Sequence, residues 1–410
     1  MSEREFDLVL WGATGFTGRL VAEYLLERHG VGQELRWAIG GRSESKLETI
    51  RAELGSAGSA LPLIVGDGED EGFLSLLAQR TAVVCTTVGP YARYGSKLVA
   101  ACVAHGTDAC DLTGEVQWMR RMIDAHTKEA EATGARIVHT CGFDSIPSDL
   151  GVAFVQREMQ ARHGVACERV HGRVAGFSGG MSGGTAASML EMLEEGARDP
   201  SLRRLLADPY ALNPEGQRQG PDTADATAPK WDEDFSQWTG PFVMAGINTR
   251  VVRRTNALLG NPWGADFGYD EAMLTGAGPG GWLKAAGVSA STVGMVAAGA
   301  IGPLRSLLGR LVPAPGEGPS AAQREAGYWD LRFLGEHPTE PNQPLRARVT
   351  GDRDPGYGST AKMLGESAVC LAKDPSSVGG GFWTPAAALG EPLQRRLETH
   401  AGVTFEIEAD

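Results

Sequence analysis

The stretch VLWGATGFTGR, residues 9–19, decides the fold of this 410-residue chain. Its three glycines, Gly12, Gly15 and Gly18, follow an apolar run and precede a segment with helical periodicity. A dinucleotide pyrophosphate needs a close approach of the backbone and N–H groups that point at it, and a glycine turn before a helix provides both. The spacing is G-x-x-G-x-x-G and not the commoner G-x-G-x-x-G. The stretch is therefore either a nucleotide cradle or a purely structural turn.

The surrounding chain favours the cradle. Over about the first 150 residues, apolar runs typical of buried parallel strands alternate with helical patterns. The runs lie at residues 6–11, 35–42, 60–67, 81–90, 107–115 and 135–141. This alternation predicts an α/β fold, with a Rossmann-type doubly wound parallel sheet and the cradle between its first strand and first helix. The predicted cradle residues are Gly12, Thr14, Gly15, Phe16, Thr17 and Gly18.

The end of the second strand indicates which nucleotide is bound. An NAD site usually has an acidic residue there, which binds the ribose hydroxyls. The stretch AIGGRSESK, residues 38–46, instead places Arg42 directly after the strand, with Ser43 and Lys46 nearby. Arg42 can pair bidentately with a 2′-phosphate, Ser43 can add a hydrogen bond, and Lys46 adds positive charge. We predict NADP(H), with a solvated surface Arg42 as the alternative.

Two further turns are predicted to contact the cofactor. Asp67 follows the third strand and can either hydrogen-bond the adenine or cap a helix. Val88, Gly89 and Pro90 follow the fourth strand, at the position where such folds pass the nicotinamide ribose. The alternative for these three residues is a plain turn.

The pattern changes after residue 150. We expect a helix over 150–162, a strand over 169–176 and a long surface loop over 205–235, which is rich in proline, glycine and polar residues. Residues 328–336 and 344–352 alternate like paired antiparallel strands, and 359–372 has the pattern of an amphipathic helix. The second region is therefore predicted to be an α+β domain.

Composition excludes several classes of function. The net charge of −13 argues against a nucleic-acid partner. The six cysteines form no C-x-x-C and are predicted to be buried free thiols of a reducing compartment. The eight histidines have no metal-ligand spacing, so no metal is predicted. The charged start, MSEREFD, lacks the apolar region of a secretory signal, so we expect a cytoplasmic protein.

Residues 285–304 carry no charge and are long enough to span a membrane. Alanine, glycine, serine and threonine dominate the stretch, which makes its hydrophobicity weak. We therefore predict a buried or interfacial helix, with peripheral contact to membrane or lipid as the alternative to contact with an apolar substrate.

Two familiar catalytic motifs are poorly supported. G-x-S-x-G occurs at 176–180 and again at 180–184, but a glycine- and serine-rich run generates such matches easily, and no histidine is placed as a base. We expect a mobile loop there that lines the substrate cleft. Tyr91 and Tyr94 precede Lys97 by six and three residues, so the Tyr-x-x-x-Lys spacing of short-chain reductases is absent.

The stretch CGFDSIPSD, residues 141–149, follows the sixth strand. Ligands of open α/β sheets bind beyond the carboxyl ends of the strands, so Asp144 and Ser145 are predicted to face the cleft. The alternative is a capping turn, in which Ser148 or Asp149 caps the next helix.

Several of these motifs together resemble the saccharopine dehydrogenase-like oxidoreductases, and most closely the trans-acting enoyl reductases. The resemblance covers nearly the whole chain, and TTVGPYARYG together with GFDSIPSD is its most specific part. The motifs are GATGFTGR, GGR, TTVGPYARYG, DLTGE, GFDSIPSD, SGGTAASMLE, FVMAGINTRVVRRTNALLG, DRDPGYGSTAKMLGESAVCLA and TPAAALG. The resemblance implies an NADP-binding Rossmann domain over 1–150, an α+β substrate or dimerisation domain over 151–352, and a C-terminal segment, 353–410, that returns to the first domain.

The resemblance also implies an activity. Trans-acting enoyl reductases act for polyketide synthases that lack a working reductase domain, in making long-chain surface lipids of actinobacteria. We therefore expect NADPH-dependent reduction of a hydrophobic enoyl thioester bound to a carrier protein, with a polyketide synthase as partner and a homodimer as the assembly. Tyr94 is the candidate donor to the developing enolate oxygen, and Asp144 and Ser145 orient Tyr94 or the substrate.

Two other functions remain as alternatives. One is reduction of an imine or ketone in a small metabolite, as in saccharopine enzymes, for which Arg250, Arg253 and Arg254 would be carboxylate ligands unless they form a surface stripe. The other is a non-catalytic NADPH-binding sensor or scaffold.

Overall fold

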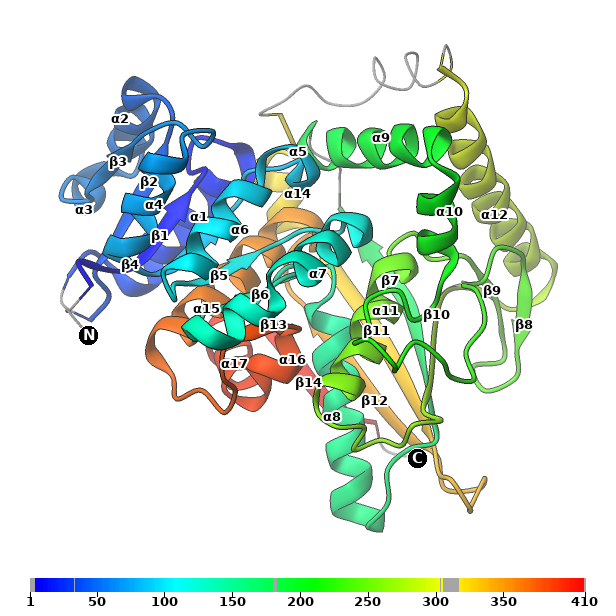
Figure 1. Ribbon diagram of the computed structural model, residues 1–410. Helices are drawn as coiled ribbons and strands as arrows, with labels where there is room; N and C mark the ends of the chain where they lie inside the picture. The colour runs from blue at the N-terminus through cyan, green and yellow to red at the C-terminus, as the bar shows by residue number, and fades with distance from the viewer. Residues whose placement is uncertain (1–3, 33, 180–182, 303, 305–316, 409–410) are drawn as a thin grey trace.

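Two seven-stranded sheets organise the chain, for which the computed structural model describes residues 4–32, 34–179, 183–302, 304 and 317–408 (Figure 1). The first sheet has the strand order β13-β6-β5-β4-β1-β2-β3, and all of its neighbouring strands are parallel. Its strands are β1 (Phe6–Trp11), β2 (Trp37–Gly41), β3 (Leu63–Val65), β4 (Thr81–Thr86), β5 (Asp108–Asp111), β6 (Arg136–Val138) and β13 (Gly381–Trp383). The predicted Rossmann-type sheet is confirmed, and its seventh strand comes from the C-terminal region.

Helices cover both faces of this sheet. One face carries α1 (Phe16–His29) and α15 (Thr360–Lys373), which pack against each other, and the other carries α4 (Glu71–Arg80), α6 (Ser96–Ala104) and α7 (Val116–Thr133). The side chains of β1 alternate between the two cores. Leu8 and Leu10 join the core that contains Leu364, whereas Val9 and Trp11 join the core that contains Leu98. Burial on both faces explains why these strands are apolar throughout.

The strand order places a ligand crevice next to the glycine turn. The sheet runs outward from β1 through β2 to β3 on one side, and from β4 through β5 and β6 on the other. The order therefore reverses between β1 and β4, and in open α/β sheets a ligand binds beyond the carboxyl ends of the strands at such a point. Short helices follow three strands of this sheet. They are α2 (Glu44–Glu53) and α3 (Gly55–Gly58) after β2, α5 (Tyr91–Tyr94) after β4, and α16 (Pro385–Ala388) and α17 (Gly390–Arg396) after β13.

The second sheet is mixed, with the order β14-β12-β11-β7-β10-β9-β8. Only the β7–β10 pair is parallel among its described strands. Its strands are β7 (Arg169–Ser178), β8 (Lys230–Asp232), β9 (Gln237–Gly240), β10 (Gly268–Gly276), β11 (Tyr328–Glu336), β12 (Leu345–Gly351) and β14 (Val403–Ile407). The helices α8 (Ile146–His163) and α11 (Ala245–Leu258) pack on one face, where Gly151 of α8 lies against the buried ring of Phe333. The α+β character of this region and its antiparallel pair β11–β12 are confirmed.

The helix α9 (Gly183–Arg198) crosses from α5 of the first region toward α12 (Gly278–Ala300), as Figure 1 shows. The described part of the predicted segment 285–304 lies mainly in α12. The expected helix is present, and Ala285 and Ser289 are buried, but Val293 is 56% exposed and Ile301 is 51% exposed, so its buried alternative is wrong for most of the described part and its interfacial alternative stays a prediction. Within the described residues, none of the helices has the length and apolar character needed to cross a membrane.

Two other expectations need correction. The segment 205–235 is only partly a surface loop, because α10 (Pro200–Ala207) extends into it and Ala211 and Leu212 are fully buried. The expected helix near 359–372 is present as α15. Almost all of its residues are buried between α1, the first sheet and α17, so it is not an amphipathic helix with one face in solvent. The segment after 353 contributes β13 to the first sheet and β14 to the second. Domain limits at 150 and 352 stay a prediction.

Candidate functional site

The glycine turn is built to leave space and N–H groups at the start of α1. Gly12 adopts a φ of +96°, which favours glycine, and Gly15 is the N-cap of α1 without a side-chain cap. The first turn of α1 contains no acidic residue. A Cβ atom at Gly15 would meet only the carbonyl oxygen of Gly12, at 3.4 Å, so the space over the turn is open. These features fit a pyrophosphate, which needs free N–H groups and positive dipole at a helix N-terminus.

The other cradle side chains have different surroundings. Thr14 and Thr17 are half-buried, and a Cβ atom at Gly41, the last residue of β2, would lie 3.6 Å from Thr14. Phe16 faces the second region, with its ring 5.2 Å from that of Tyr357 and the guanidinium of Arg324 over it at 5.6 Å. The ring of Phe16 already packs against Tyr357 and Arg324. A contact of Phe16 with the nucleotide therefore stays a prediction.

The end of β2 carries two cations. Arg42 and Lys46 are exposed, and within the described residues neither side chain has a hydrogen bond or an ion pair. Ser43 is the N-cap of α2 and accepts a hydrogen bond from the backbone N–H of Lys46 at 3.4 Å. The positive charges beside β2 are thus free to meet a 2′-phosphate. Asp67 is exposed and accepts from the N–H of Glu69 at 3.0 Å, whereas the cap of α4 is Asp70, so the helix-cap alternative for Asp67 is wrong.

The turn after β4 lies directly against the cradle. The hydroxyl of Thr87 donates to the carbonyl oxygen of Gly12 at 3.1 Å, and a Cβ atom at Gly12 would lie 2.6 Å from Cγ2 of Val88. Gly89 is exposed and Pro90 is buried. The structure therefore brings the cradle and the predicted Val88–Pro90 turn together at the point where the strand order reverses.

Asp144 and Ser145 lie between β6 and α8 and carry unpaired polar atoms. Ser145 is fully buried, and neither its Oγ nor Oδ1 of Asp144 has a hydrogen-bond partner within the described residues. Burial and, to a smaller extent, the nearby charge of Glu271 together raise the pKa of Asp144 to about 7. Unpaired buried polar atoms are rare and need an explanation such as a ligand or a catalytic role.

The capping alternative for this stretch is wrong. The helix α8 begins at Ile146, and Ser145 occupies the N-cap position without a side-chain cap. Asp149 lies inside the first turn, where it accepts from the Thr255 hydroxyl at 2.5 Å and from the N–H of Ala386 at 2.7 Å. Burial raises the pKa of Asp149 to about 7, and these hydrogen bonds oppose the shift. Asp149 therefore joins α8, α11 and the first turn of α16, and it does not cap α8.

Tyr94 is not joined to these residues. It ends α5 with its side chain 37% exposed, and the guanidinium of Arg93 lies 5.9 Å from the centre of its ring. Within the described residues, no hydrogen bond links Tyr94 to Asp144 or Ser145. The buried tyrosine of this turn is Tyr91, whose hydroxyl donates to the carbonyl oxygen of Thr86 at 3.1 Å.

Sequence reasoning missed two buried carboxyl groups near the site. Glu271 on β10 is 4% exposed and accepts from the Tyr269 hydroxyl at 2.6 Å and from Nδ2 of Asn248 at 3.0 Å. Glu115, in the loop before α7, accepts from two backbone N–H groups of α5. Burial raises the pKa of both groups. The motif DLTGE contained a signal for Glu115, because an acidic residue ended a loop at the carboxyl edge of the sheet.

The three arginines of α11 are neither substrate ligands nor a surface stripe. All three are buried and bind groups of the chain itself. Arg250 donates to Asp225 at 2.7 Å, Arg253 donates to Asp222 at 2.6 Å, and Arg254 donates to the carbonyl oxygen of Phe382 at 2.7 Å. Both predicted roles for these residues are therefore wrong.

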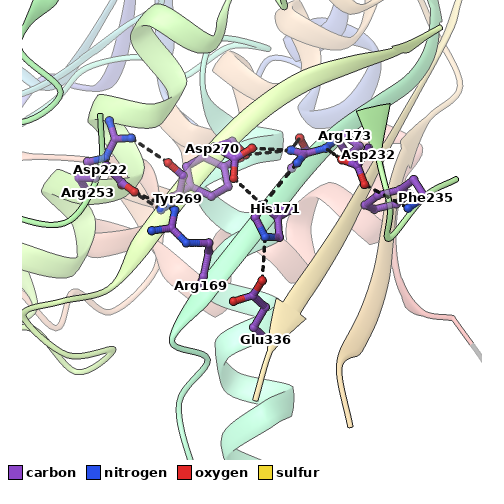
Figure 2. A network of polar contacts seen from close by, with 11 residues as sticks. Arg169, His171, Arg173, Asp222, Asp232, Phe235, Arg253, Tyr269, Asp270 and Glu336 are labelled. Atoms are coloured by element: carbon purple, nitrogen blue, oxygen red, sulfur yellow. Dashed lines mark hydrogen bonds and ion pairs between the residues drawn. The ribbon is translucent and has the colours of Figure 1, made fainter. Parts of the chain in front are cut away.

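Figure 2 shows the polar network to which Arg253 and Asp222 belong, on β7, β10 and their neighbours. His171 lies at its centre, with Nδ1 2.5 Å from Asp270 and Nε2 3.0 Å from Glu336. Arg173 bridges Asp270 and Asp232 at 2.7 and 2.6 Å. Because each charged side chain in this network has a partner of opposite charge on the second sheet, on α11 or in the segment before β8, the network is structural.

The remaining motifs add little chemistry. The expected loop over the overlapping G-x-S-x-G matches is wrong at both of its ends, because residues 176–178 belong to β7 and residues 183–184 to α9. Residues 180–182 of the matches lie outside the described residues. The six cysteines are buried and unpaired, as predicted. In the part of the chain that the structure describes, the His, Cys, Asp and Glu side chains form no group of three or more that could hold a metal ion.

Comparisons with known proteins agree with this architecture. The family profile of the saccharopine dehydrogenase NADP binding domain matches residues 8–138. A protein of Mycobacterium tuberculosis named provisionally as a trans-acting enoyl reductase is 42% identical over 98% of this chain and 97% of its own length. The trans-acting enoyl reductase of Mycobacterium leprae is 39% identical over 98% of both chains. Saccharopine dehydrogenase (L-Glu forming) of Saccharomyces cerevisiae has a TM-score of 0.54 at 11% identity, covering 98% of this chain and 99% of its own, which supports the fold alone.

Proposed function

Because the chain belongs to the trans-acting enoyl reductase family, with a saccharopine dehydrogenase-type NADP-binding domain, we propose that it reduces the C=C bond of an α,β-unsaturated acyl thioester. It is an NADP-dependent oxidoreductase. The observation that carries the proposal is identity over the full length, which includes the second region that would bind the substrate. The geometry of the candidate site supports it in three ways.

The first support is the match between the site and NADP(H). Gly15 leaves open space over a helix N-terminus, Arg42 and Lys46 carry unpaired positive charge beside β2, and the Val88–Pro90 turn meets the cradle. In the proposed complex the cradle binds the pyrophosphate, Arg42 binds the 2′-phosphate, and the Val88–Pro90 turn lies beside the nicotinamide ribose. NADPH, when bound, supplies the hydride that adds to the β-carbon of the substrate.

The second support is a proton donor next to an unpaired hydroxyl. Hydride addition at the β-carbon moves negative charge to the thioester oxygen, and a proton must then be added at the α-carbon. We assign the hydrogen bond to the thioester oxygen to Ser145, and the proton to the Asp144 carboxyl, which regains a proton from water. A raised pKa suits Asp144 for this role because its acid form persists near neutral pH. Tyr94 stays a candidate donor on sequence grounds.

The third support concerns the competing substrates. Amino-acid substrates of saccharopine-type enzymes present carboxylates, which require accessible cations. Arg250, Arg253 and Arg254 are buried and bind Asp225, Asp222 and a backbone carbonyl. Since these cations are occupied, the site favours an uncharged acyl thioester. We further propose that the thioester is carried by the carrier protein of a polyketide synthase. The homodimer and contact with a membrane stay predictions.

The test follows NADPH absorbance with three substrates. These are an α,β-unsaturated acyl group on coenzyme A, the same acyl group on a carrier protein, and an amino acid together with a keto acid. We expect oxidation with the carrier-bound enoyl group, faster than with the coenzyme A form. Oxidation only with the amino acid and keto acid would overturn the proposal, and tight NADPH binding without oxidation of any kind would favour a sensor.

A further inference from the structure

Glu115 reaches from the loop between β5 and α7 to the neighbouring loop after β4. Its carboxylate is buried and binds two consecutive backbone N–H groups, with Oε1 accepting from Tyr91 at 2.8 Å and Oε2 from Ala92 at 2.7 Å. Both N–H groups lie at the start of α5, directly after Pro90. A carboxylate that accepts two N–H groups at once fixes both the position and the direction of the backbone that it binds.

Glu115 is itself held in place. Its N–H donates to the Thr113 hydroxyl at 3.1 Å, and the N–H of Thr113 donates to Asp111 at 3.0 Å. The other oxygen of Asp111 lies 2.6 Å from Nδ1 of His139. Tyr91 adds a second link between the same two loops, because its hydroxyl accepts from the N–H of Leu112 at 3.4 Å. The carboxylate therefore acts from a rigid base at the carboxyl edge of the sheet.

The backbone that Glu115 holds is the continuation of the Val88–Pro90 turn. On its other side this turn contacts the cradle, through the hydrogen bond from Thr87 to Gly12 and the packing of Val88. Above it lies α9, since a Cβ atom at Gly89 would lie 3.7 Å from Oγ of Ser188. Burial raises the pKa of Glu115, and the N–H groups of Ala92 and Tyr91 and, to a smaller extent, the Ser188 side chain oppose that shift. Glu115 thus holds the end of a turn that packs between the cradle and α9.

We propose that Glu115 is a positioning residue for the nicotinamide half of NADP(H), because it fixes the Val88–Pro90 turn between the cradle and α9. The adenosine half binds at β2 in the proposed complex and does not depend on Glu115. The inference rests on the proposed cofactor contacts and not on the identity of the substrate. Both carboxylate oxygens are needed, because a glutamine amide at this position would turn an N–H toward one of the two backbone N–H groups.

The test measures binding of two ligands in the absence of any substrate. NADPH probes both halves of the site, whereas adenosine 2′,5′-bisphosphate probes only the adenosine half. For Glu115→Gln we expect NADPH affinity to fall about tenfold or more, and affinity for the bisphosphate to change less than about twofold. Glu195→Gln is the matched control, since it removes a carboxylate that pairs with Gln117 and Arg121 but does not touch α5. Its affinities for both ligands should equal those of the unmodified chain.

Unchanged NADPH affinity in Glu115→Gln would overturn the inference, and so would an equal loss for both ligands, which indicates a general structural role. If Glu115→Gln does not fold, Glu115→Asp replaces it, because aspartate keeps the charge but is one methylene too short to hold both N–H groups. Glu115→Asp should lose NADPH affinity selectively, and identical behaviour to the unmodified chain would contradict the inference. Failure of the enoyl reductase proposal leaves these binding results intact, since no turnover is measured.

Discussion

A Cβ atom at Gly18 would lie 2.2 Å from the carbonyl oxygen of Gly12, which is far inside van der Waals contact. A Cβ atom at Gly15 would meet that same oxygen at 3.4 Å and nothing else within 4 Å. Two glycines of one motif therefore serve different purposes. Gly18 permits the close packing of α1 on the turn, and Gly15 keeps the space above the turn open.

This difference predicts that an alanine substitution at Gly15 affects cofactor affinity, whereas one at Gly18 affects the stability of the fold. Gly15→Ala should fold with nearly unchanged stability, because Gly15 has a φ of −78° that alanine also adopts, but its NADPH affinity should fall about tenfold or more. Gly18→Ala should lose about 1–3 kcal/mol of unfolding free energy from overpacking. Urea denaturation and NADPH titration of both variants check this, and similar losses of stability in the two would refute the assignment.

Arg42 should decide the preference for NADPH over NADH. Arg42→Ala removes a charge-assisted contact to the 2′-phosphate, so NADPH affinity should fall roughly 10- to 100-fold while NADH affinity stays constant. Arg51→Ala is the control, because Arg51 lies on α2, the helix that follows Arg42, and pairs with Glu48. Direct titration with both nucleotides measures the preference. An equal effect on NADPH and NADH would mean that Arg42 is a solvated surface residue.

Asp144 should limit turnover at high pH. Its raised pKa, about 7, keeps the acid form available at neutral pH, and turnover should fall as pH rises through that value. Asp144→Asn should lower kcat by about 100-fold or more and remove this limb of the pH profile. Turnover with a carrier-bound enoyl thioester measures both. Tyr94→Phe is the companion variant, and if it loses activity while Asp144→Asn retains it, the donor is Tyr94.

The same group should reduce stability at neutral pH. A carboxyl whose folded-state pKa is raised binds its proton more tightly in the folded chain, so stability declines as pH rises from about 4 to about 7 and stays lower above that. Asp144→Asn removes this cost. We expect it to unfold with about 1–4 kcal/mol more free energy than the unmodified chain at pH 8, since one pKa unit is roughly 1.4 kcal/mol, and with equal free energy at pH 4. If the variant is less stable than the unmodified chain at pH 8, the charged Asp144 carboxylate does not destabilise the folded chain, and the prediction is wrong.

The sequence predicted those parts of the site whose residues are neighbours along the chain. The glycine spacing and the position of Arg42 after β2 are local patterns, and they follow from the periodicity of one strand, one turn and one helix. Glu115 and Tyr91 are 24 residues apart, and Asn248 and Glu271 are 23 apart. The motif DLTGE indicates an acidic residue at the carboxyl edge of the sheet, but no local pattern shows which partners such a residue will meet, so the contacts of both carboxyl groups emerged only from the fold.

Tertiary packing also explains the errors outside the site. The strand β13 has three residues, too few to show a period of two, and only its pairing with β6 identifies it. The proline- and glycine-rich composition of 205–235 correctly indicated a lack of regular structure in much of it. It could not indicate burial, because burial there depends on Arg250 and Arg253 of α11, which bind Asp225 and Asp222 of that segment.

His171 should make the second sheet more stable at acid than at alkaline pH. Burial, the largest effect, and the charge of Arg173 lower the pKa of His171, but the hydrogen bond and charge of Asp270 and the hydrogen bond to Glu336 outweigh them, so the pKa is raised (Figure 2). A raised folded-state pKa means that the stabilisation is complete below about pH 6.5 and is lost as pH rises through the folded-state value. His171→Gln should therefore lose about 1 kcal/mol of unfolding free energy at pH 6 and clearly less at pH 9. His126→Gln is the control, since in the described part of the chain the one ion pair of His126 is with Glu129 on its own helix, α7. Urea denaturation at both pH values measures the difference, and a loss that is constant with pH would show that His171 acts by packing alone.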